Sequence, residues 1–577
     1  MTQSAGKFYG KVDELEEAIY SETRRKTRKR LSIIGISTLI LIAIIVIAVV
    51  ATNHGSSEDN PNPNTSSESL SKSIKAICDA TLYPSSCLST LSPMINSTTA
   101  LLDPTKLFLF SVKAAMSEIS KASKALKELA QKVAVDKMSL AAFKDCNELI
   151  DLAIEHLNDS LSTPDISSGD VVNDLKTWLS GSITDQQTCI DGFSNSNVEL
   201  KTSVLNTMKN STELTSNSLA ILSEISNFIG SIKLRRLMSN SEDTDWSPSW
   251  LSSNDRRLLQ SSTDPRKKAD IVVAKDRSSK YKTIKAALKA VPEKSKKRFI
   301  IYIKKGLYIE NVNIETNKWN LFMVGDGKNA TIVSGSLNFI DGTSTFQSAT
   351  FAVFGKGFMA SDIGFKNTAG PQKHQAVAMM SHADQSVFYR CSFDAYQDTL
   401  YVHSLRQFYR ECDVYGTVDF IFGNAAVVLQ NCNILPKRPM AGQQDTITAQ
   451  GKVDPNQNTG IVFHNCTVWP SENLTSVGVY LGRPWKPYST TLFIKSMLAS
   501  FIDPSGWLPW SGNSAPDTIF YAEYQNSGAG SSTKKRVKWK GLRSILNAKQ
   551  VAKFSVGSFI GGDKWLPNTG VPYKSGL

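Results

Sequence analysis

Two aspartates occupy equivalent positions in consecutive copies of a short repeat. Asp398 lies seven residues after Cys391, and Asp419 lies seven residues after Cys412. If each repeat is one coil of stacked parallel strands, equivalent residues lie roughly 5 Å apart on the same face. Two carboxylates at that separation repel each other, so one is expected to have a raised pKa and to keep its proton. The spacing therefore predicts an acid beside a base.

An acid beside a base is what ester hydrolysis through a covalent intermediate requires. One carboxylate attacks the ester carbonyl, and its protonated partner delivers the proton to the departing alkoxide. Amide side chains can donate hydrogen bonds to the oxyanion, and Gln397 and Gln375 are the candidate donors. This chemistry needs no metal and no cofactor. The Gly-x-Ser-x-Gly elbow of serine hydrolases is absent, and the six histidines form no ligand or triad motif.

The repeat that positions these aspartates is marked by cysteines. Residues 388–391, 409–412, 429–432 and 463–466 each end in a cysteine, at successive separations of 21, 20 and 34 residues. A period near 20 in a region of short β-rich runs predicts an all-β domain, a right-handed parallel β-helix over residues 269–572. The leucine and asparagine signature of leucine-rich repeats is missing. The cysteines would point inward, either as a stack of thiols or with a Cys412–Cys432 disulfide between adjacent coils.

Residues 69–229 have apolar side chains at helical spacing, for example Leu126, Leu129 and Val133. The pattern predicts an all-α domain, an antiparallel four-helix bundle. Four further cysteines in this region argue for two disulfides. Proximity in the sequence favours the pairs Cys78–Cys87 and Cys146–Cys189, while the spacing leaves the other pairings open.

The N-terminal segments indicate export. Residues 1–30 end in a strongly basic run and are expected to be cytoplasmic, and the apolar stretch 31–51 is long enough for a transmembrane signal anchor. A polar linker follows at 52–68. Sequons for glycosylation, which agree with export, occur at Asn64, Asn96, Asn158, Asn210, Asn329, Asn465 and Asn473.

A second linker, residues 230–268, separates the helical and β-rich regions. It carries two dibasic sites followed by leucine, Arg235–Arg236 and Arg256–Arg257. Two such sites in a Ser- and Asp-rich stretch between domains predict proteolytic processing, so a processing protease is an expected partner.

The formal net charge of +13 favours polyanionic partners, namely nucleic acid, an anionic membrane or an acidic polysaccharide. The sequence has no zinc-finger spacing, helix-turn-helix pattern or RNA-binding aromatic signature. These absences argue against nucleic acid as the partner.

Five short blocks occur in order across the β-rich region, at residues 306–310 (GLYIE), 375–378 (QAVA), 397–400 (QDTL), 419–423 (DFIFG) and 481–485 (LGRPW). Together they resemble the ordered signature blocks of plant pectin methylesterases. The start of the helical region, residues 78–87, resembles plant invertase and pectin methylesterase inhibitor domains. The resemblance implies a secreted pectinesterase that acts on methylesterified homogalacturonan in the cell wall, behind an autoinhibitory pro-region. Separate inhibitor proteins are further expected partners.

The resemblance also implies roles for individual residues. Asp419 is similar to the family's nucleophile, and Asp398 to its general acid and later general base. Gln397 and Gln375 resemble the oxyanion donors, and Arg483 resembles the residue that holds the nucleophile. Contacts with the sugar are implied for Thr345, Gln375, Phe422, Arg483 and Trp485.

Two other classes compete with an esterase. A pectin-degrading glycosidase on the same fold would often hold its carboxylates further apart to admit water, and a lyase would need an acidic cluster that binds calcium. A non-catalytic pectin-binding or inhibitor protein would use the helical region alone. The Gln–Asp pair on adjacent rungs disfavours the glycosidase and the lyase. A measurement of methanol release and of chain shortening separates all three classes.

Overall fold

The computed structural model describes residues 74–92, 104–132, 136–163, 166, 168–237, 264–512, 515–543 and 546–577. They belong to two compact units, which divide between Asp245 and Trp246. The predicted N-terminal segments 1–30, 31–51 and 52–68 lie outside the described residues. Within the described ranges, no helix combines the length and the apolar character that a membrane span requires.

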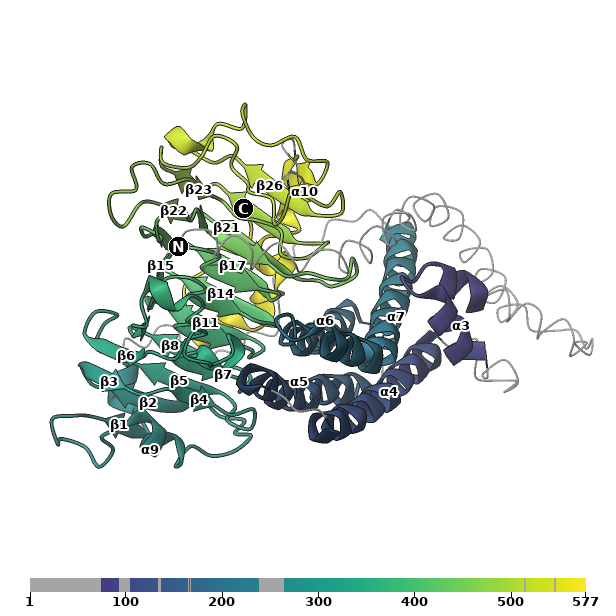
Figure 1. Cartoon of the computed structure of the whole chain (residues 1–577), viewed down its shortest axis with the longest axis horizontal. Helices are drawn as coiled ribbons and strands as arrows, with labels where there is room; N and C mark the ends of the chain where they lie inside the picture. Colours follow the sequence, from purple (N-terminus) through teal and green to yellow (C-terminus); the bar gives the residue numbers. More distant parts are fainter. Residues whose placement is uncertain are drawn as a thin grey trace, which may run out of the picture. The chain divides into compact units, whose positions relative to one another are not determined.

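The first unit is a bundle of long helices (Figure 1). Helix α4 contacts α5 and α7, and α6 contacts the same two helices, which closes a four-helix bundle around buried residues such as Val112, Leu149 and Leu179. The aspartate before α5 accepts hydrogen bonds from the first amides of that helix, which satisfies donors that the helix itself leaves unpaired. The helices are α3 (Pro84–Leu91), α4 (Pro104–Lys132), α5 (Lys137–Leu161), α6 (Gly169–Asp191) and α7 (Val198–Leu237).

Two disulfides join elements of this bundle. Cys78 pairs with Cys87 at the start of the unit, and Cys146 pairs with Cys189 to link α5 to α6, so both pairings that the spacing favours are confirmed. Helix α7 continues past the predicted domain end at residue 229, to Leu237. Arg235 and Arg236 are therefore in the last turn of a helix rather than in a linker.

The second unit is a coil of strands that stack into sheets (Figure 1), and the paired strands of the described residues run parallel. Sheet A contains β1 (Ile271–Val273), β2 (Phe299–Ile303), β5 (Leu321–Val324), β8 (Met359–Ser361), β11 (Ser386–Tyr389), β14 (Arg406–Arg410), β17 (Ala426–Gln430), β21 (Gly460–His464), β24 (Thr490–Ile494), β26 (Phe520–Tyr524) and β27 (Leu542–Arg543). Sheet B contains β3 (Gly306–Ile309), β6 (Thr331–Gly335), β9 (Gly364–Asn367), β12 (Ser392–Asp394), β15 (Asp413–Gly416), β18 (Asn433–Pro436), β22 (Thr467–Val468) and β25 (Met497–Leu498). Sheet C contains β4 (Val312–Ile314), β7 (Phe351–Val353), β10 (Met379–Ser381), β13 (Leu400–Val402), β16 (Ile421–Gly423) and β20 (Thr448–Gln450), and β19 (Asp445–Thr446) pairs separately with β23 (Val479–Tyr480).

From β2 to β20, each of six successive coils places one strand in each of sheets A, B and C. Ser392 pairs with Asp413 in sheet B and Leu400 pairs with Ile421 in sheet C, so both sheets keep the 21-residue period. The interior is filled by side chains that stack from coil to coil. The ring of Phe388 lies 4.7 Å from that of Tyr409, for example. This parallel β-helix confirms the predicted fold class.

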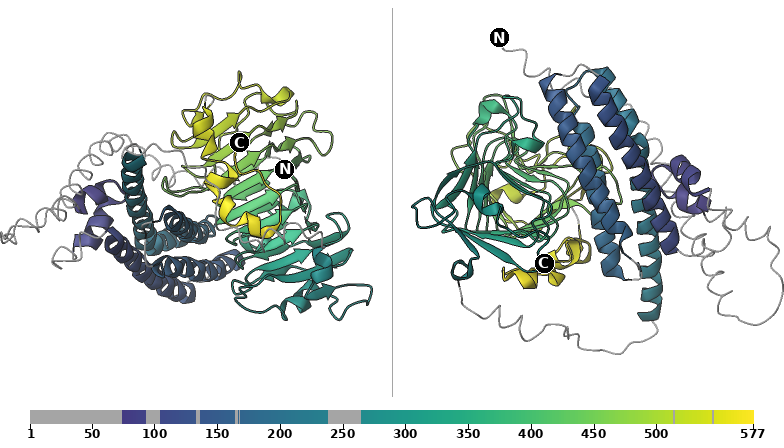
Figure 2. Two further views of the ribbon diagram at one scale, coloured as in Figure 1. Left: turned by 180° about the vertical axis from the view of Figure 1, so that it is seen from behind. Right: turned by 90° about the horizontal axis from the view of Figure 1, so that it is seen from below.

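The C-terminal segment covers the outer face of sheet A. Helices α10 (Ala548–Ala552) and α11 (Val556–Phe559) bury apolar residues against that face, and the segment, drawn in yellow, crosses its strands in Figure 2. The packing continues beyond the predicted domain end at residue 572, because the Lys574 amide donates to the side chain of Gln430 at 2.8 Å.

Candidate active site

Asp398, Asp419 and Thr446 occupy one rung on three consecutive coils. Leu400 pairs with Ile421, and Ile421 pairs with Thr448, so the residues two positions earlier are also in register. Strand spacing is about 4.8 Å, which brings neighbouring side chains on one rung into contact range. The predicted juxtaposition of the two aspartates therefore follows from the observed register.

Both aspartates adopt a left-handed backbone conformation, with φ of +63° at Asp398 and +52° at Asp419. Such a conformation is unfavourable for residues with a side chain, and it concentrates at functional sites. Because the same turn recurs on both coils, it points both carboxylates in the same direction. Other turns of the same coils also contain a left-handed residue, for example Arg390 and Glu411, so the conformation is a repeating feature of the β-helix.

The two carboxyl groups have different electrostatic environments. Burial raises the pKa of Asp398 well above its ordinary value, the charge of Asp419 raises it further, and the nearby Arg483 lowers it. Asp419 instead forms a two-point ion pair, in which Arg483 Nε donates to Oδ1 at 2.8 Å and Nη2 donates to Oδ2 at 2.6 Å. Asp398 is therefore suited to hold a proton, and Asp419 is suited to carry a negative charge.

Arg483 reaches Asp419 because the chain passes unusually close to β20. A Cβ atom built on Gly482 would lie 1.9 Å from the Thr448 hydroxyl, so only glycine fits there. The Arg483 amide then donates to the Thr448 carbonyl at 2.9 Å. On its other side, the guanidinium lies 4.5 Å from the ring centroid of Trp510.

The two glutamines lie on neighbouring coils beside the carboxylates. Gln397 directly precedes Asp398 and is buried, whereas Gln375 is partly exposed. The backbone amide that follows Gln375 donates to the Gln397 carbonyl at 3.2 Å, which ties the two segments together. Their amide groups are of the type that can donate hydrogen bonds to an oxyanion.

Aromatic rings extend from the acids along sheet C. Phe422 stacks on Tyr401 with ring centroids 4.1 Å apart, and Trp485 lies 6.3 Å from Phe422. Trp510 lies a further 6.4 Å from Trp485. Tyr401 and Phe422 are buried, whereas Trp485 and Trp510 are partly exposed and offer apolar faces on which sugar rings can stack.

Thr345 begins a short turn that is anchored to the same coils. Its carbonyl accepts a hydrogen bond from Ser348 Oγ, which in turn accepts from the Val377 amide. Val377 is on the rung of Asp398, since Met379 pairs with Leu400. The structure thus brings Thr345, Gln375, Gln397, Asp398, Asp419, Phe422, Arg483 and Trp485 to one region of the β-helix.

Sequence reasoning missed Thr446 and Trp510. Thr446 lies 27 residues after Asp419 rather than 21, because extra residues precede β19, and this breaks the repeat that located the aspartates. A search that allowed one insertion per coil would have aligned it. Nothing in the sequence around Trp510 marks it as a neighbour of Arg483.

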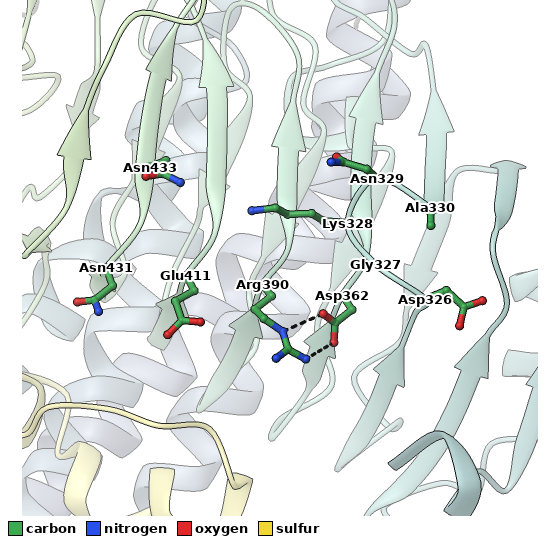
Figure 3. A pocket seen from close by; sticks show the side chains of 10 residues that line it. All are labelled: Asp326, Gly327, Lys328, Asn329, Ala330, Asp362, Arg390, Glu411, Asn431 and Asn433. Carbon is green, nitrogen blue, oxygen red and sulfur yellow. Dashed lines mark hydrogen bonds and ion pairs between the residues drawn. The ribbon is translucent and has the colours of Figure 1, made fainter. Parts of the chain in front are cut away.

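A cavity of about 680 Å³ lies elsewhere on the β-helix (Figure 3), and none of its lining residues belongs to the aspartate rung. Its acids are already paired. Arg390 binds both oxygens of Asp362, and Tyr302 donates to Asp326. The two stacked carboxyl groups lie on the aspartate rung instead, so the candidate catalytic centre is there and not in this cavity.

The predicted Cys412–Cys432 disulfide is wrong. Cys391, Cys412, Cys432 and Cys466 are all buried free thiols, and the Cys466 thiol donates to the Leu429 carbonyl at 3.2 Å. In-register parallel strands hold equivalent Cβ atoms nearly a full strand spacing apart, whereas a disulfide needs about 3.8 Å. The interpretation as a thiol stack is the one that agrees with the structure.

Several predicted modification sites can be located. The sequon asparagines Asn158, Asn210, Asn329, Asn465 and Asn473 are exposed, as a glycan would require. Asn64, Asn96 and the Arg256–Arg257 site lie outside the described residues.

Known proteins resemble both units. Residues 270–563 match the pectinesterase family, and residues 72–221 match the plant invertase/pectin methylesterase inhibitor family. An Arabidopsis thaliana protein named "Putative pectinesterase/pectinesterase inhibitor 24" is 53% identical over 573 residues, which cover 99% of each chain. "Pectinesterase 3" of Phaseolus vulgaris is 46% identical over 590 residues, again 99% of each chain. The structure of a pectin methylesterase from carrot is 51% identical with a TM-score of 0.53, and it covers 54% of this chain and 98% of that one.

Proposed function

Because the chain belongs to the pectinesterase family, we propose that it hydrolyses the C6 methyl esters of galacturonate in pectin with Asp419 as its nucleophile. A carboxylate oxygen of Asp419 attacks the ester carbonyl carbon, and the carbonyl electrons move onto the oxygen. Gln397 and Gln375 donate hydrogen bonds to this oxyanion. When the intermediate collapses, the bond to the methoxy oxygen breaks, and Asp398 gives its proton to the departing methoxide.

The second step regenerates the enzyme. Asp398, now ionised, takes a proton from water as the water oxygen attacks the acyl carbon of the anhydride to Asp419. The tetrahedral intermediate expels the Asp419 carboxylate and leaves a free galacturonic acid group. Throughout, Arg483 holds Asp419 in place, and Thr345, Phe422 and Trp485 contact the sugar.

The observation that carries this proposal is the difference between the two acids on one rung. Asp398 has a raised pKa, while Asp419 is held by two donors from one guanidinium. A nucleophilic mechanism needs that difference, because the acid must be protonated while the nucleophile is ionised. The net charge of +13 suits a polyanionic substrate such as partly de-esterified homogalacturonan.

The test is the product analysis of highly methylated pectin after incubation with the protein. The esterase should release methanol and acidify the polymer while its chain length stays constant. New reducing ends would indicate a glycosidase, and unsaturated ends would indicate a lyase. Either result would overturn the proposal.

The N-terminal inhibitor-family domain is the pro-region of this enzyme and restrains it until the connecting segment is cut. The dibasic sites at Arg235–Arg236 and Arg256–Arg257 are the proposed cleavage positions. Full-length protein should be less active than the same preparation after cleavage. Double alanine variants of each site, assayed separately, identify which cut matters. Equal activity of intact and cleaved protein would contradict the restraint.

Export to the cell wall completes the proposal. The 31–51 segment anchors the precursor in the membrane of the secretory pathway, and the exposed sequon asparagines carry glycans. N-terminal sequencing of protein recovered from the cell wall tests both the route and the processing. A recovered N-terminus upstream of residue 69 would mean that the inhibitor domain stays attached.

A further inference from the structure

Thr446 contacts Asp419 at two points. The Thr446 hydroxyl donates to Asp419 Oδ1 at 2.6 Å. The Thr446 hydroxyl oxygen in turn accepts a hydrogen bond from the Asp419 backbone amide at 2.9 Å. Since the amide occupies a lone pair of the threonine oxygen, the hydroxyl proton is directed to the carboxylate. One side chain therefore holds both the strained backbone of Asp419 and its carboxyl group.

The bonds to Asp419 are distributed unequally between its two oxygens. Oδ1 accepts from Arg483 Nε and from Thr446, whereas Oδ2 accepts only from Arg483 Nη2 among the described residues. A carboxylate oxygen has two in-plane lone pairs. Oδ1 is thus fully occupied by the described donors, and Oδ2 keeps one lone pair for another partner.

We propose that Thr446 is a positioning residue for the ester hydrolysis, which locks Asp419 so that Oδ2 is the atom that attacks the substrate. The inference rests on the proposed function of Asp419 as the nucleophile. In the acylation step, Oδ2 forms the new bond to the ester carbonyl carbon. Oδ1 becomes the carbonyl oxygen of the anhydride and keeps its hydrogen bond from Thr446, while methoxide leaves with the proton from Asp398.

The fold supports this role because Thr446 is itself firmly held. Its exposed fraction is 1%, so water does not compete for the hydroxyl. Its carbonyl accepts from the Phe420 amide, and in strand β19 it pairs with Tyr480 of β23, three residues before Arg483. The two side chains that bond Asp419 therefore come from neighbouring segments of the same coil stack.

The test compares Thr446→Val with Thr446→Ser in the full-length protein, assayed after limited proteolysis of the 230–268 segment. Valine keeps the shape and removes the hydroxyl, so kcat should fall about 10- to 100-fold while KM changes by less than about twofold. Serine keeps the hydroxyl and should restore kcat to within about threefold of the parent. This split between kcat and KM, with rescue by serine, is not expected of a residue that only supports the fold.

Thr459→Val is the matched control. Thr459 is also buried, and its hydroxyl donates to a side-chain oxygen, Asn424 Oδ1, at the same 2.6 Å. This variant should keep the parental kcat, because neither residue touches the aspartate rung. A similar loss in Thr459→Val would show that any buried hydroxyl deletion lowers kcat, and it would overturn the inference.

Two further outcomes also decide the matter. Parental kcat in Thr446→Val, or a serine variant as impaired as valine, overturns the positioning role. If the valine variant does not fold, Thr446→Cys, which keeps the volume with a weaker donor, replaces it under the same criteria. Asp419→Asn is assayed in parallel. If Asp419→Asn keeps its turnover, the assignment of Asp419 as the nucleophile is wrong. If Asp419→Asn is inactive and Thr446→Val is fully active, only the positioning role of Thr446 is wrong.

Discussion

Arg483 holds Asp419 by both carboxylate oxygens, at 2.8 and 2.6 Å, while the face of its guanidinium lies 4.5 Å from the Trp510 ring. The ion pair is largely shielded from solvent, with side-chain exposures of 15% and 7%. A planar fork with two donors fixes the rotation of a carboxylate, which a point charge cannot do. The orientation of the proposed nucleophile therefore depends on the shape of arginine as well as on its charge.

Replacement of Arg483 by lysine tests this dependence. Lysine keeps the charge but loses the two-point geometry and the stacking on Trp510, so kcat/KM should fall about 100-fold. The matched control is Arg390→Lys, because Arg390 forms the same two-point pair with Asp362 in the cavity of Figure 3. That variant should retain parental activity. If Arg483→Lys is equally active, charge alone suffices at this position.

Asp419→Asn should abolish turnover and leave the fold intact. A neutral amide cannot form the acyl-enzyme, while its size keeps the packing of the rung. Methanol release should fall by at least about a thousandfold, with an unchanged circular dichroism spectrum. Asp362→Asn serves as the control, because it removes an arginine-paired carboxylate that is not on the aspartate rung. Retained turnover in Asp419→Asn would rule out the nucleophile assignment.

The same variant should lower the pKa of Asp398. Burial and the charge of Asp419 raise this pKa, and Arg483 lowers it. Without the carboxylate at 419 the repulsion disappears and the arginine charge is no longer neutralised, so both changes favour the ionised form of Asp398. Carboxyl carbon NMR as a function of pH measures the shift. An unchanged pKa would mean that burial alone sets the protonation of Asp398.

The sequence predicted the aspartate pair because the coil period is constant where the pair occurs. Asp398 and Asp419 are 21 residues apart, and the strands after them are paired at that same interval. A β-helix converts such a constant interval directly into spatial proximity. Contacts between the pair and the next coil were beyond this reasoning, because the chain inserts residues before Thr446 and so changes the interval.

Side-chain chemistry inside the coil was less predictable than position. The cysteine repeat correctly indicated inward-facing thiols, but spacing alone did not distinguish a thiol stack from a Cys412–Cys432 bridge. Only the register, which keeps equivalent Cβ atoms a strand spacing apart, decides between them. Similarly, the approach of Arg483 depends on the contact of Gly482 with β20, which is a tertiary detail.

The buried carboxyl group of Asp445, the neighbour of Thr446, should make the stability of the protein depend on pH. It is buried, neither of its oxygens has a hydrogen-bond partner among the described residues, and burial, reinforced by the charge of Glu472, raises its pKa from 3.8 to about 8. Between pH 3.8 and about 8, the folded protein therefore keeps a proton on Asp445 that the unfolded chain has already released. Across that window the contribution of Asp445 to stability falls as the pH rises.

Asp445→Asn removes this titration. Its melting temperature relative to the parent should rise between pH 4 and pH 8, by about 5 °C or more, because only the parent bears the growing cost of keeping a buried carboxyl protonated that ionises freely in the unfolded chain. Any loss from the new amide is independent of pH and cancels in the comparison. Asp517→Asn, at an exposed ion pair with Lys540, should show a nearly constant difference. A constant difference for Asp445→Asn as well would mean that Asp445 ionises normally in the folded protein.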